Sequence, residues 1–271
     1  MTARQLASQL LIATIFVAFN ALAQEPNYEP EYGQPGKDVV WVPTPDITLE
    51  KMMDMANVTS SDFVVDLGSG DGRNVIAAAK RGARALGVEY NPDLVALARH
   101  NALAQGVADR AEFVHGDMFT ADISRATAMA LFLLPENLQR LGPRFLDLRP
   151  GTRIVSNTFA IAGWEALRTD TAEGDCGEWC EILLYIVPAK VAGTWRMAQG
   201  ELNLEQKAQV LTGTLTSGGV SRRIESGRMN GEEIAFFVDG SEYFGRHKDG
   251  TLSGSIQGKV SGNWTATRAH P

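Results

Sequence analysis

The chain has 271 residues, which is enough for one full α/β domain and a smaller second module. Hydrophobic residues make up 44% of it and charged residues 21%, a composition typical of a folded globular protein and not of a disordered one. The formal net charge of −7 argues against a nucleic-acid partner, because such partners are held mainly through Lys and Arg on phosphates.

The N-terminal segment has the pattern of an export signal. Arg4 precedes a long apolar run, and the sequence Ala-Leu-Ala at 21–23 matches a small-x-small cleavage site. We therefore expect residues 1–23 to be a signal peptide, which leaves a periplasmic or secreted chain with no stable membrane span. An uncleaved N-terminal anchor is the alternative. It gives the same orientation, because acids and not bases follow the apolar run.

Residues 24–42 are rich in Pro, Gly and Glu, which predicts an irregular leader. The next segment predicts a helix with Thr44 as its cap and Pro45 at its first position. Beyond this helix, apolar strands alternate with helices. The strands are expected at 62–67, 83–90, 110–117, 127–135 and 151–159.

The intervening helices carry end signals. Gly82 is expected to end one of them, and Asn91 is expected to cap the next. A further helix is expected to be interrupted or ended near Pro143. Continuous apolar strands separated by helices indicate a parallel sheet covered on both faces. Residues 43–190 are therefore expected to form a doubly wound, Rossmann-like domain with a mostly parallel sheet.

From about Val191 the pattern changes to short alternating runs separated by Gly-Gly, Asn-Gly and Asp-Gly turns, which are hairpin signals. Two Gly-x-Trp units, at 193–195 and 262–264, bracket this segment. We expect residues 191–271 to form a small antiparallel β-barrel or sandwich of roughly six strands. A scaffold or partner-binding role is expected for it, because no cluster of titratable residues is visible there.

Two cysteines, Cys176 and Cys180, lie close together in the sequence CGEWC. In an oxidising compartment such a pair can close a tight loop as a disulfide, and two free thiols are the alternative. No second Cys/His pair lies nearby and the four histidines are scattered singly, so no metal site is expected.

A glycine-rich loop follows the first strand of the expected sheet. The strand ends in Asp66, and Gly68, Gly70 and Gly72 come next, so backbone N–H groups would gather at a helix N-terminus. A dinucleotide fingerprint requires G-x-G-x-x-G, whereas position 73 is Arg73, and the carboxylate of Asp66 would repel a pyrophosphate. The loop is therefore expected to bind a ligand with a cationic ammonium group, such as S-adenosylmethionine.

Two further acids end the next two strands. Glu89 is placed to accept hydrogen bonds from vicinal ribose hydroxyls, and Asp117 is placed to accept one from an adenine amino group. Each acid alone could equally be a helix cap or a surface residue. Together with Asp66 they line the crevice at the carboxyl ends of the strands, where open α/β sheets bind ligands.

These motifs resemble a known family. Residues 63–118, with VVDLGSGDG, look like the cofactor half of class I S-adenosylmethionine-dependent methyltransferases. From Val42 to Trp164, the segments VPTP, GVEYNPDLVALAR, DMF, FLLPENL and LRPGTRIVSNTF resemble the ATP synthase c-subunit lysine methyltransferases and their bacterial relatives. The resemblance implies cofactor contacts from Thr44, Asp66, Gly68, Ser69, Gly70, Gly72, Glu89, Asp117 and Met118.

The resemblance also implies methyl transfer, with a protein lysine or another amine as the expected acceptor. The alternatives are a small-molecule thiol or oxygen acceptor, or an inactive cofactor-binding protein whose β module binds a partner. The chain has FLLP where methylators of amides and other nitrogens often carry Asn-Pro-Pro-Tyr, and no catalytic base is evident from the spacing. The polar candidates at strand ends are Thr44, Asp71, Ser156 and Asn157, and Trp164 is a candidate wall of the acceptor pocket.

Overall fold

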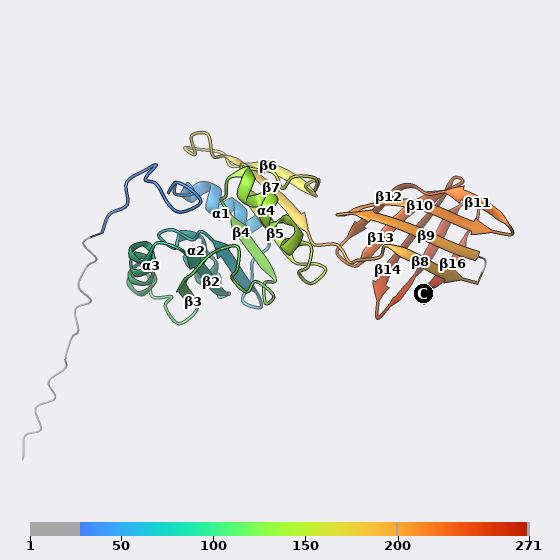
Figure 1. Ribbon diagram of the computed structural model, residues 1–271, viewed down its shortest axis with the longest axis horizontal. Coiled ribbons are helices and arrows are strands. Elements are labelled where there is room, and N and C mark those ends of the chain that lie inside the picture. The colour runs from blue at the N-terminus through green and yellow to red at the C-terminus, as the bar shows by residue number, and fades with distance from the viewer. Residues whose placement is uncertain (1–27, 199, 270–271) are drawn as a thin grey trace, which may run out of the picture.

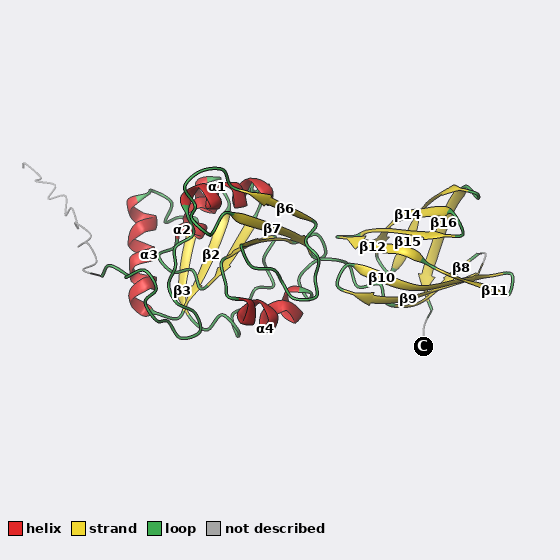
Figure 2. Cartoon of the chain, turned by 90° about the horizontal axis from the view of Figure 1, so that it is seen from above, coloured by secondary structure: helices red, strands yellow, loops and turns green. Residues whose placement is uncertain are grey.

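The computed structural model describes residues 28–198 and 200–269. The expected signal peptide lies outside these residues. Figures 1 and 2 show two modules side by side along the long axis, a mixed sheet with its helices and then an all-β module. Within the described part of the chain, no helix is both long and apolar enough to cross a membrane.

The first module is built on a seven-stranded sheet with the order β3-β2-β1-β4-β5-β7-β6. Strands β1 to β5 run parallel, whereas β7 runs antiparallel to both β5 and β6. The strands are β1 (Phe63–Leu67), β2 (Arg84–Glu89), β3 (Ala111–His115), β4 (Ala128–Leu131), β5 (Arg153–Asn157), β6 (Arg168–Thr171) and β7 (Glu181–Ile186). The Rossmann-like, mostly parallel sheet expected from the sequence is confirmed, and the β6–β7 hairpin extends it.

Four helices cover the sheet: α1 (Asp46–Met55), α2 (Arg73–Lys80), α3 (Pro92–Ala104) and α4 (Pro135–Phe145). The cap of α3 is confirmed, because the side chain of Asn91 accepts a hydrogen bond from the backbone N–H of Asp93. Gly82, two residues beyond α2, has a φ of +88°, in agreement with its expected role as a helix stop.

One detail of the helix prediction is wrong, because Thr44 does not cap α1; the cap position falls on Pro45, with no side-chain cap hydrogen bond. The expected end of a helix near Pro143 is confirmed, since α4 is not interrupted there and ends two residues later at Phe145. Pro143 stands in the last turn of α4 and removes one backbone hydrogen bond there, while the buried side chains of Leu138 and Leu141 anchor the helix.

The core of this module lies in two layers, one on each face of the sheet. Helices α1, α2 and α3 cover one face through buried side chains such as Met52, Val75 and Ala98. Helix α4 covers the other face, where Leu138 and Phe145 belong to the cluster that surrounds Leu131. This double coverage explains why the central strands read as continuous apolar runs.

The second module is a closed antiparallel barrel and not a sandwich. Its strands are β8 (Gly193–Met197), β9 (Gly200–Lys207), β10 (Val210–Ser217), β11 (Val220–Arg223), β12 (Glu225–Asn230), β13 (Glu233–Val238), β14 (Ser241–Lys248), β15 (Thr251–Gly258) and β16 (Gly262–Arg268). The sheet order β11-β10-β12-β13-β14-β15-β16-β8-β9 is closed by an additional β9–β10 pairing. Because β11 and β12 pair with successive parts of β10, they form one bent strand, and the barrel has eight.

The estimate of roughly six strands is therefore wrong. The turn between β9 and β10 is made by Ala208 and Gln209, and Ala208 adopts a φ of +48° without any Gly-containing dipeptide to mark it. Closure leaves few unpaired strand edges. The interior is filled by apolar side chains, among them Trp195, Phe236 and Leu252, each with no exposed surface.

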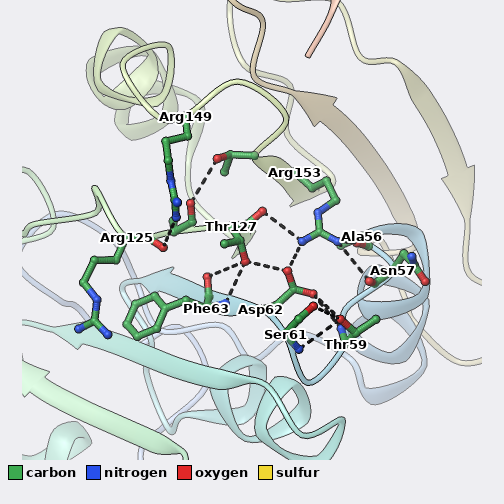
Figure 3. A network of polar contacts seen from close by, with 12 residues as sticks. Ala56, Asn57, Thr59, Ser61, Asp62, Phe63, Arg125, Thr127, Arg149 and Arg153 are labelled. Atoms are coloured by element: carbon green, nitrogen blue, oxygen red, sulfur yellow. Dashed lines mark hydrogen bonds and ion pairs between the residues drawn. The ribbon is translucent and has the colours of Figure 1, made fainter. Parts of the chain in front are cut away.

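A buried ion pair joins three strands at the amino-terminal edge of the first module's sheet (Figure 3). Asp62, only 7% exposed, lies just before β1 and accepts hydrogen bonds from Arg153 at the start of β5 and from Thr127 just before β4. It also accepts one from the backbone N–H of Thr59 at 2.8 Å. Arg153 in turn donates to the carbonyl of Ala56 at the end of α1, at 3.0 Å.

Burial of Asp62 favours its protonated form, but the hydrogen bonds from Thr127, Thr59 and Arg153 outweigh this and lower its pKa below the usual 3.8. The ionised carboxylate therefore stabilises the fold above pH 3.8, and this contribution is lost as the pH falls below that value. We expect Asp62→Asn to lower the free energy of unfolding by about 3 kcal/mol at pH 7, because it leaves Arg153 without its charged partner.

Urea unfolding of the wild type and the variant between pH 7 and pH 3 measures this effect. The difference between the two proteins should shrink at the acid end of the range. Asp109→Asn is the matched control, since Asp109 is largely exposed and its ion pair with Arg110 should contribute little. A difference that does not change with pH would show that the charge of Asp62 is not what stabilises this edge.

Candidate active site

The turn between β1 and α2 requires its glycines. Gly68, Gly70 and Gly72 have φ values of +71°, +54° and +85°, a region that residues with a Cβ rarely adopt. A Cβ at Gly70 would lie 2.9 Å from Nε1 of Trp41, and one at Gly72 would lie 2.7 Å from the ring of Phe113. Gly70 thus lets the leader approach the turn, whereas Gly72 lets α2 pack onto β3.

A cavity of about 480 Å³ lies beside this turn, at the carboxyl ends of β1, β2 and β4. All of its lining residues fall between positions 34 and 132, so none comes from the barrel. Of the residues predicted to contact the cofactor, those that line it are Thr44, Asp66, Gly68, Ser69, Gly70, Glu89 and Met118. Gly72 and Asp117 do not line it.

Asp66 is the most buried acid of this cavity, with 2% of its surface exposed. Burial raises the pKa of Asp66 well above its usual 3.8, and the negative charges of Glu89 and Asp71 raise it further, although Asn74 opposes the shift. The Oδ1 atom of Asn74 is also buried and has no hydrogen-bond partner among the described residues. A buried carboxyl group and a free amide oxygen together are suited to bind a cation.

Glu89 lies at the end of β2 and contacts both sides of the cavity. Its Oε2 accepts a hydrogen bond from the backbone N–H of Gly70 at 2.9 Å, and its Oε1 accepts one from that of Asn91 at 2.8 Å. Both bonds hold the carboxylate in a fixed orientation at the cavity wall. Because each carboxylate oxygen has a second lone pair, Glu89 remains able to accept hydrogen bonds from two hydroxyl groups of a ligand.

Asp117 contacts the leader and not the cavity. Lys37 of the leader donates to its Oδ2 at 2.6 Å, and the backbone N–H of Phe119 donates to its Oδ1 at 2.8 Å. These two hydrogen bonds lower the pKa of Asp117. Lys37 itself lines the cavity, and its Nζ lies 4.5 Å from the ring centre of Tyr90. The leader therefore places a cation beside Asp117, where the sequence predicted only the acid.

Arg73 and Asp71 form a rigid pair at the start of α2. Nη2 of Arg73 lies 2.7 Å from Oδ2 of Asp71, and its Nη1 donates to the carbonyl of Thr44 at 2.9 Å. Asp71 also accepts a hydrogen bond from the backbone N–H of Arg73 at 3.3 Å and so satisfies one donor of the helix end, although the cap position itself falls on Gly72. Together the pair fixes the leader to the glycine turn.

The other polar candidates have structural partners, although the buried Nδ2 of Asn157 has none among the described residues. The hydroxyl of Ser156 donates to the carbonyl of Phe159 at 2.7 Å, and Oδ1 of Asn157 accepts from the hydroxyl of Thr158 at 2.9 Å. Trp164 does not border the cavity; it is 6% exposed and packs against Tyr185 in the core. Trp164 thus lies outside the cofactor cavity.

The sequence did not reveal that the leader forms one side of the site. Residues 34–42 of the leader line the cavity, together with Pro43 and Thr44 that follow it. The carbonyl of Asp38 accepts a hydrogen bond from Asn137 of α4 at 3.0 Å, and the hydroxyl of Tyr28 lies 3.2 Å from Nδ2 of Asn91. One feature of the sequence could have indicated that the leader packs on the domain. The leader contains aromatic and charged residues among its Pro and Gly residues, and a linker exposed to solvent does not require an aromatic residue such as Trp41.

The residues present fit S-adenosylmethionine. Asp66 and Asn74 offer acceptors for its ammonium group, Glu89 offers a carboxylate for its ribose hydroxyls, and the glycine turn offers backbone N–H groups. Val88, Leu94 and Met118 supply apolar walls for a planar ring. Two acids at the same wall would repel a pyrophosphate, so a dinucleotide does not fit.

Comparison with known proteins agrees with this interpretation of the cavity. The family described as the ANTKMT methyltransferase domain matches residues 66–168. A protein-lysine N-methyltransferase from Saccharolobus islandicus is 43% identical over 129 residues, which cover 46% of this chain and 80% of that protein. An ATP synthase c-subunit lysine N-methyltransferase from Mus musculus is 37% identical over 117 residues, 43% of this chain, and the match spans about half of that protein (47%).

Among solved structures, one described as an RNA methyltransferase from Salinibacter ruber in complex with S-adenosyl-L-homocysteine is 45% identical. The superposition has a TM-score of 0.52 and covers 55% of this chain and 96% of that one. The shared part is therefore nearly all of that protein.

Asp66 gives the cofactor prediction a direct test. We expect Asp66→Asn to weaken binding of S-adenosylmethionine by about 10- to 100-fold, because a hydrogen bond to a charged group is lost. The same substitution should raise the free energy of unfolding above about pH 4, since the raised pKa of Asp66 means that its ionised form costs stability. Below the usual pKa of 3.8 this difference should vanish.

Calorimetric titration with S-adenosylmethionine and urea unfolding across pH measure the two effects. Asp109→Asn is a control with the same loss of charge at an exposed position that does not line the cavity. Unchanged affinity in Asp66→Asn, or an equal loss in both variants, would contradict the role assigned to Asp66.

Proposed function

Since this chain belongs to the family of S-adenosylmethionine-dependent methyltransferases that includes the Saccharolobus islandicus protein-lysine N-methyltransferase, we propose that it methylates the ε-amino group of a protein lysine. The observation that carries this proposal is the 43% identity over 80% of that lysine-methylating relative. The cavity supports it, because a buried acid and a diol-binding carboxylate lie together beside the glycine turn.

The relatives differ in their named acceptors, lysine in one group and RNA in the Salinibacter protein. Charge favours lysine for this chain. Its net charge of −7 would repel a polyanion, whereas RNA-binding proteins hold phosphates with Lys and Arg. A cationic lysine side chain is attracted by the same surface.

When bound, S-adenosylmethionine supplies a methyl group: the lone pair of a neutral amine forms the new N–C bond, the S–C bond breaks with its electrons left on sulfur, and S-adenosylhomocysteine is released. The chain's own residues must position the two reactants, and such positioning can account for most of the acceleration. Asp66 and Asn74 would hold the methionine end. The acceptor nitrogen must first lose its proton to water, because only the neutral amine has a free lone pair.

We further propose that the protein acts in the periplasm or outside the cell. The disulfide between Cys176 and Cys180 supports this, because disulfides persist mainly in oxidising compartments. The expected signal at 1–23 supports it as well. Activity there would require a supply of S-adenosylmethionine in the same compartment.

The proposed function is tested by incubating the protein with S-adenosylmethionine and each of four acceptors: a ten-residue lysine peptide, a single-stranded RNA, a small thiol and a catechol. We expect mass spectrometry to find methyl groups on lysine ε-nitrogens, with an equal amount of S-adenosylhomocysteine. Asp66→Asn should reduce the rate by about 10- to 100-fold at low cofactor concentration. Methylation of RNA, thiol or catechol with lysine unmodified would overturn the proposed acceptor.

A further inference from the structure

Three aromatic side chains form a continuous wall at the carboxyl edge of the sheet. The ring centres of Phe132 and Trp179 are 5.2 Å apart, those of Phe159 and Trp179 are 6.1 Å apart, and those of Phe132 and Phe159 are 6.3 Å apart. All three side chains are partly exposed. Phe132 also lines the cofactor cavity, so this aromatic wall begins inside the cavity and runs outward to the surface.

Trp179 is held by the loop between β6 and β7, residues 172–180, which we call the acceptor loop. Figure 1 shows this loop reaching toward α1. The disulfide between Cys176 and Cys180 closes it, and Cys176 is buried in the core at 3% exposure. The carbonyl of Trp179 accepts a hydrogen bond from Thr48 of α1 at 2.9 Å, and its indole N–H donates to the hydroxyl of Tyr32 at 3.3 Å. The loop is therefore fixed and does not hang free in solvent.

Phe159 is held by a strained turn at the end of β5. Thr158 has a φ of +63°, which is rare for a β-branched residue, and the backbone N–H of Phe159 donates to the carbonyl of Asn157 at 2.7 Å. The hydroxyl of Ser156 donates to the carbonyl of Phe159 and stabilises the same turn. Residues in such conformations persist where the surroundings enforce them, and they cluster at functional sites.

The acceptor loop and the residue after it carry an unbalanced negative charge. The chain has no Lys or Arg between Arg168 and Lys190. Four acids lie in or beside the loop, all of them exposed, and none forms an ion pair within the described residues: Glu173, Asp175, Glu178 and Glu181. Thus the loop that holds Trp179 of the aromatic wall also carries free carboxylates close to it in the sequence.

We propose that this aromatic wall and the acceptor loop form the docking surface for the acceptor lysine, and that the free acids select a lysine within a basic protein segment. This inference rests on the proposed function, because it assigns the substrate class of the same site. The aliphatic part of a lysine lies along the rings, and its ammonium group is attracted to aromatic faces within about 6 Å. Neighbouring basic residues of the substrate would pair with the acids, a long-range attraction that is screened by salt.

The test uses a fluorescently labelled ten-residue peptide that carries one lysine among other basic residues. Its binding to the full chain, saturated with S-adenosylhomocysteine, is measured by fluorescence anisotropy. We expect Trp179→Ala to weaken peptide binding by about tenfold and Trp179→Phe to weaken it less, since Phe retains a ring. Affinity for S-adenosylmethionine, measured by calorimetry, should change much less than peptide affinity in both variants and equally in the two, because Trp179 does not line the cavity and both variants lack the indole N–H that contacts Tyr32. That second measurement also shows that the fold and the cofactor cavity are intact.

The acids are tested by the triple variant Glu173→Gln, Asp175→Asn, Glu178→Gln. We expect its peptide binding to fall by about tenfold and to lose most of its dependence on salt. The matched control removes the same number of charges from the barrel with Glu225→Gln, Glu242→Gln and Asp249→Asn. All three control residues are exposed. This control should bind the peptide as the wild type does.

Failure of the inference can be separated from failure of the proposed function by measuring methyl transfer to the same peptide. Absence of peptide binding by the wild type overturns the inference, and so does equal weakening in the two triple variants or full binding by Trp179→Ala. Loop-dependent binding without methyl transfer to lysine would support the docking surface and contradict the proposed function. Methyl transfer that is independent of the loop would overturn the inference alone.

Discussion

The turn from β1 into α2 constrains the rest of the first module. It reverses direction through three glycines with positive φ, and two of them are in contact with other parts of the chain. Gly70 gives room to Trp41 of the leader, and Gly72 gives room to Phe113 of β3. The same few residues therefore set the cofactor loop, the position of the leader and the angle at which α2 leaves the sheet. A side chain at either position would disturb the site and the core together.

Strand β1 carries a buried aspartate at each end, and the two acids have opposite effects. Asp62, just before the strand, is fully paired by Arg153, Thr127 and Thr59, so its ionised form stabilises the fold. Asp66, inside the strand, is more deeply buried and faces other acids, so its ionised form costs stability. The physical difference is the supply of donors. At the amino edge Thr127, Thr59 and Arg153 donate to Asp62, whereas Asp66 at the carboxyl edge is desolvated beside the acids Glu89 and Asp71 and is open to a cationic ligand.

Two irregular segments complete the site that the sheet begins. The leader closes the cavity through Lys37, Trp41 and Thr44, and the acceptor loop extends its aromatic wall through Trp179. Both segments are fixed by contacts far apart in the sequence, such as the hydrogen bond from the indole of Trp179 to Tyr32. Positions on loops can serve a reaction only when the scaffold holds them, and here a disulfide, a strained turn and an arginine–aspartate pair do so.

The sequence by itself determined the alternation of strands and helices, the glycine turn and the acids that end β1 and β2. These are local signals, since burial on both faces makes a strand continuously apolar and only glycine suits the φ values of the turn. Tertiary structure alone decided that Lys37 pairs with Asp117, that Trp164 belongs to the core, and that Trp179 joins Phe132 beside the cavity. It also decided that the β module closes with eight strands, through a turn at Ala208 that carries no glycine. These outcomes depend on which distant segments meet, and hydrophobic periodicity carries information only about neighbours along the chain.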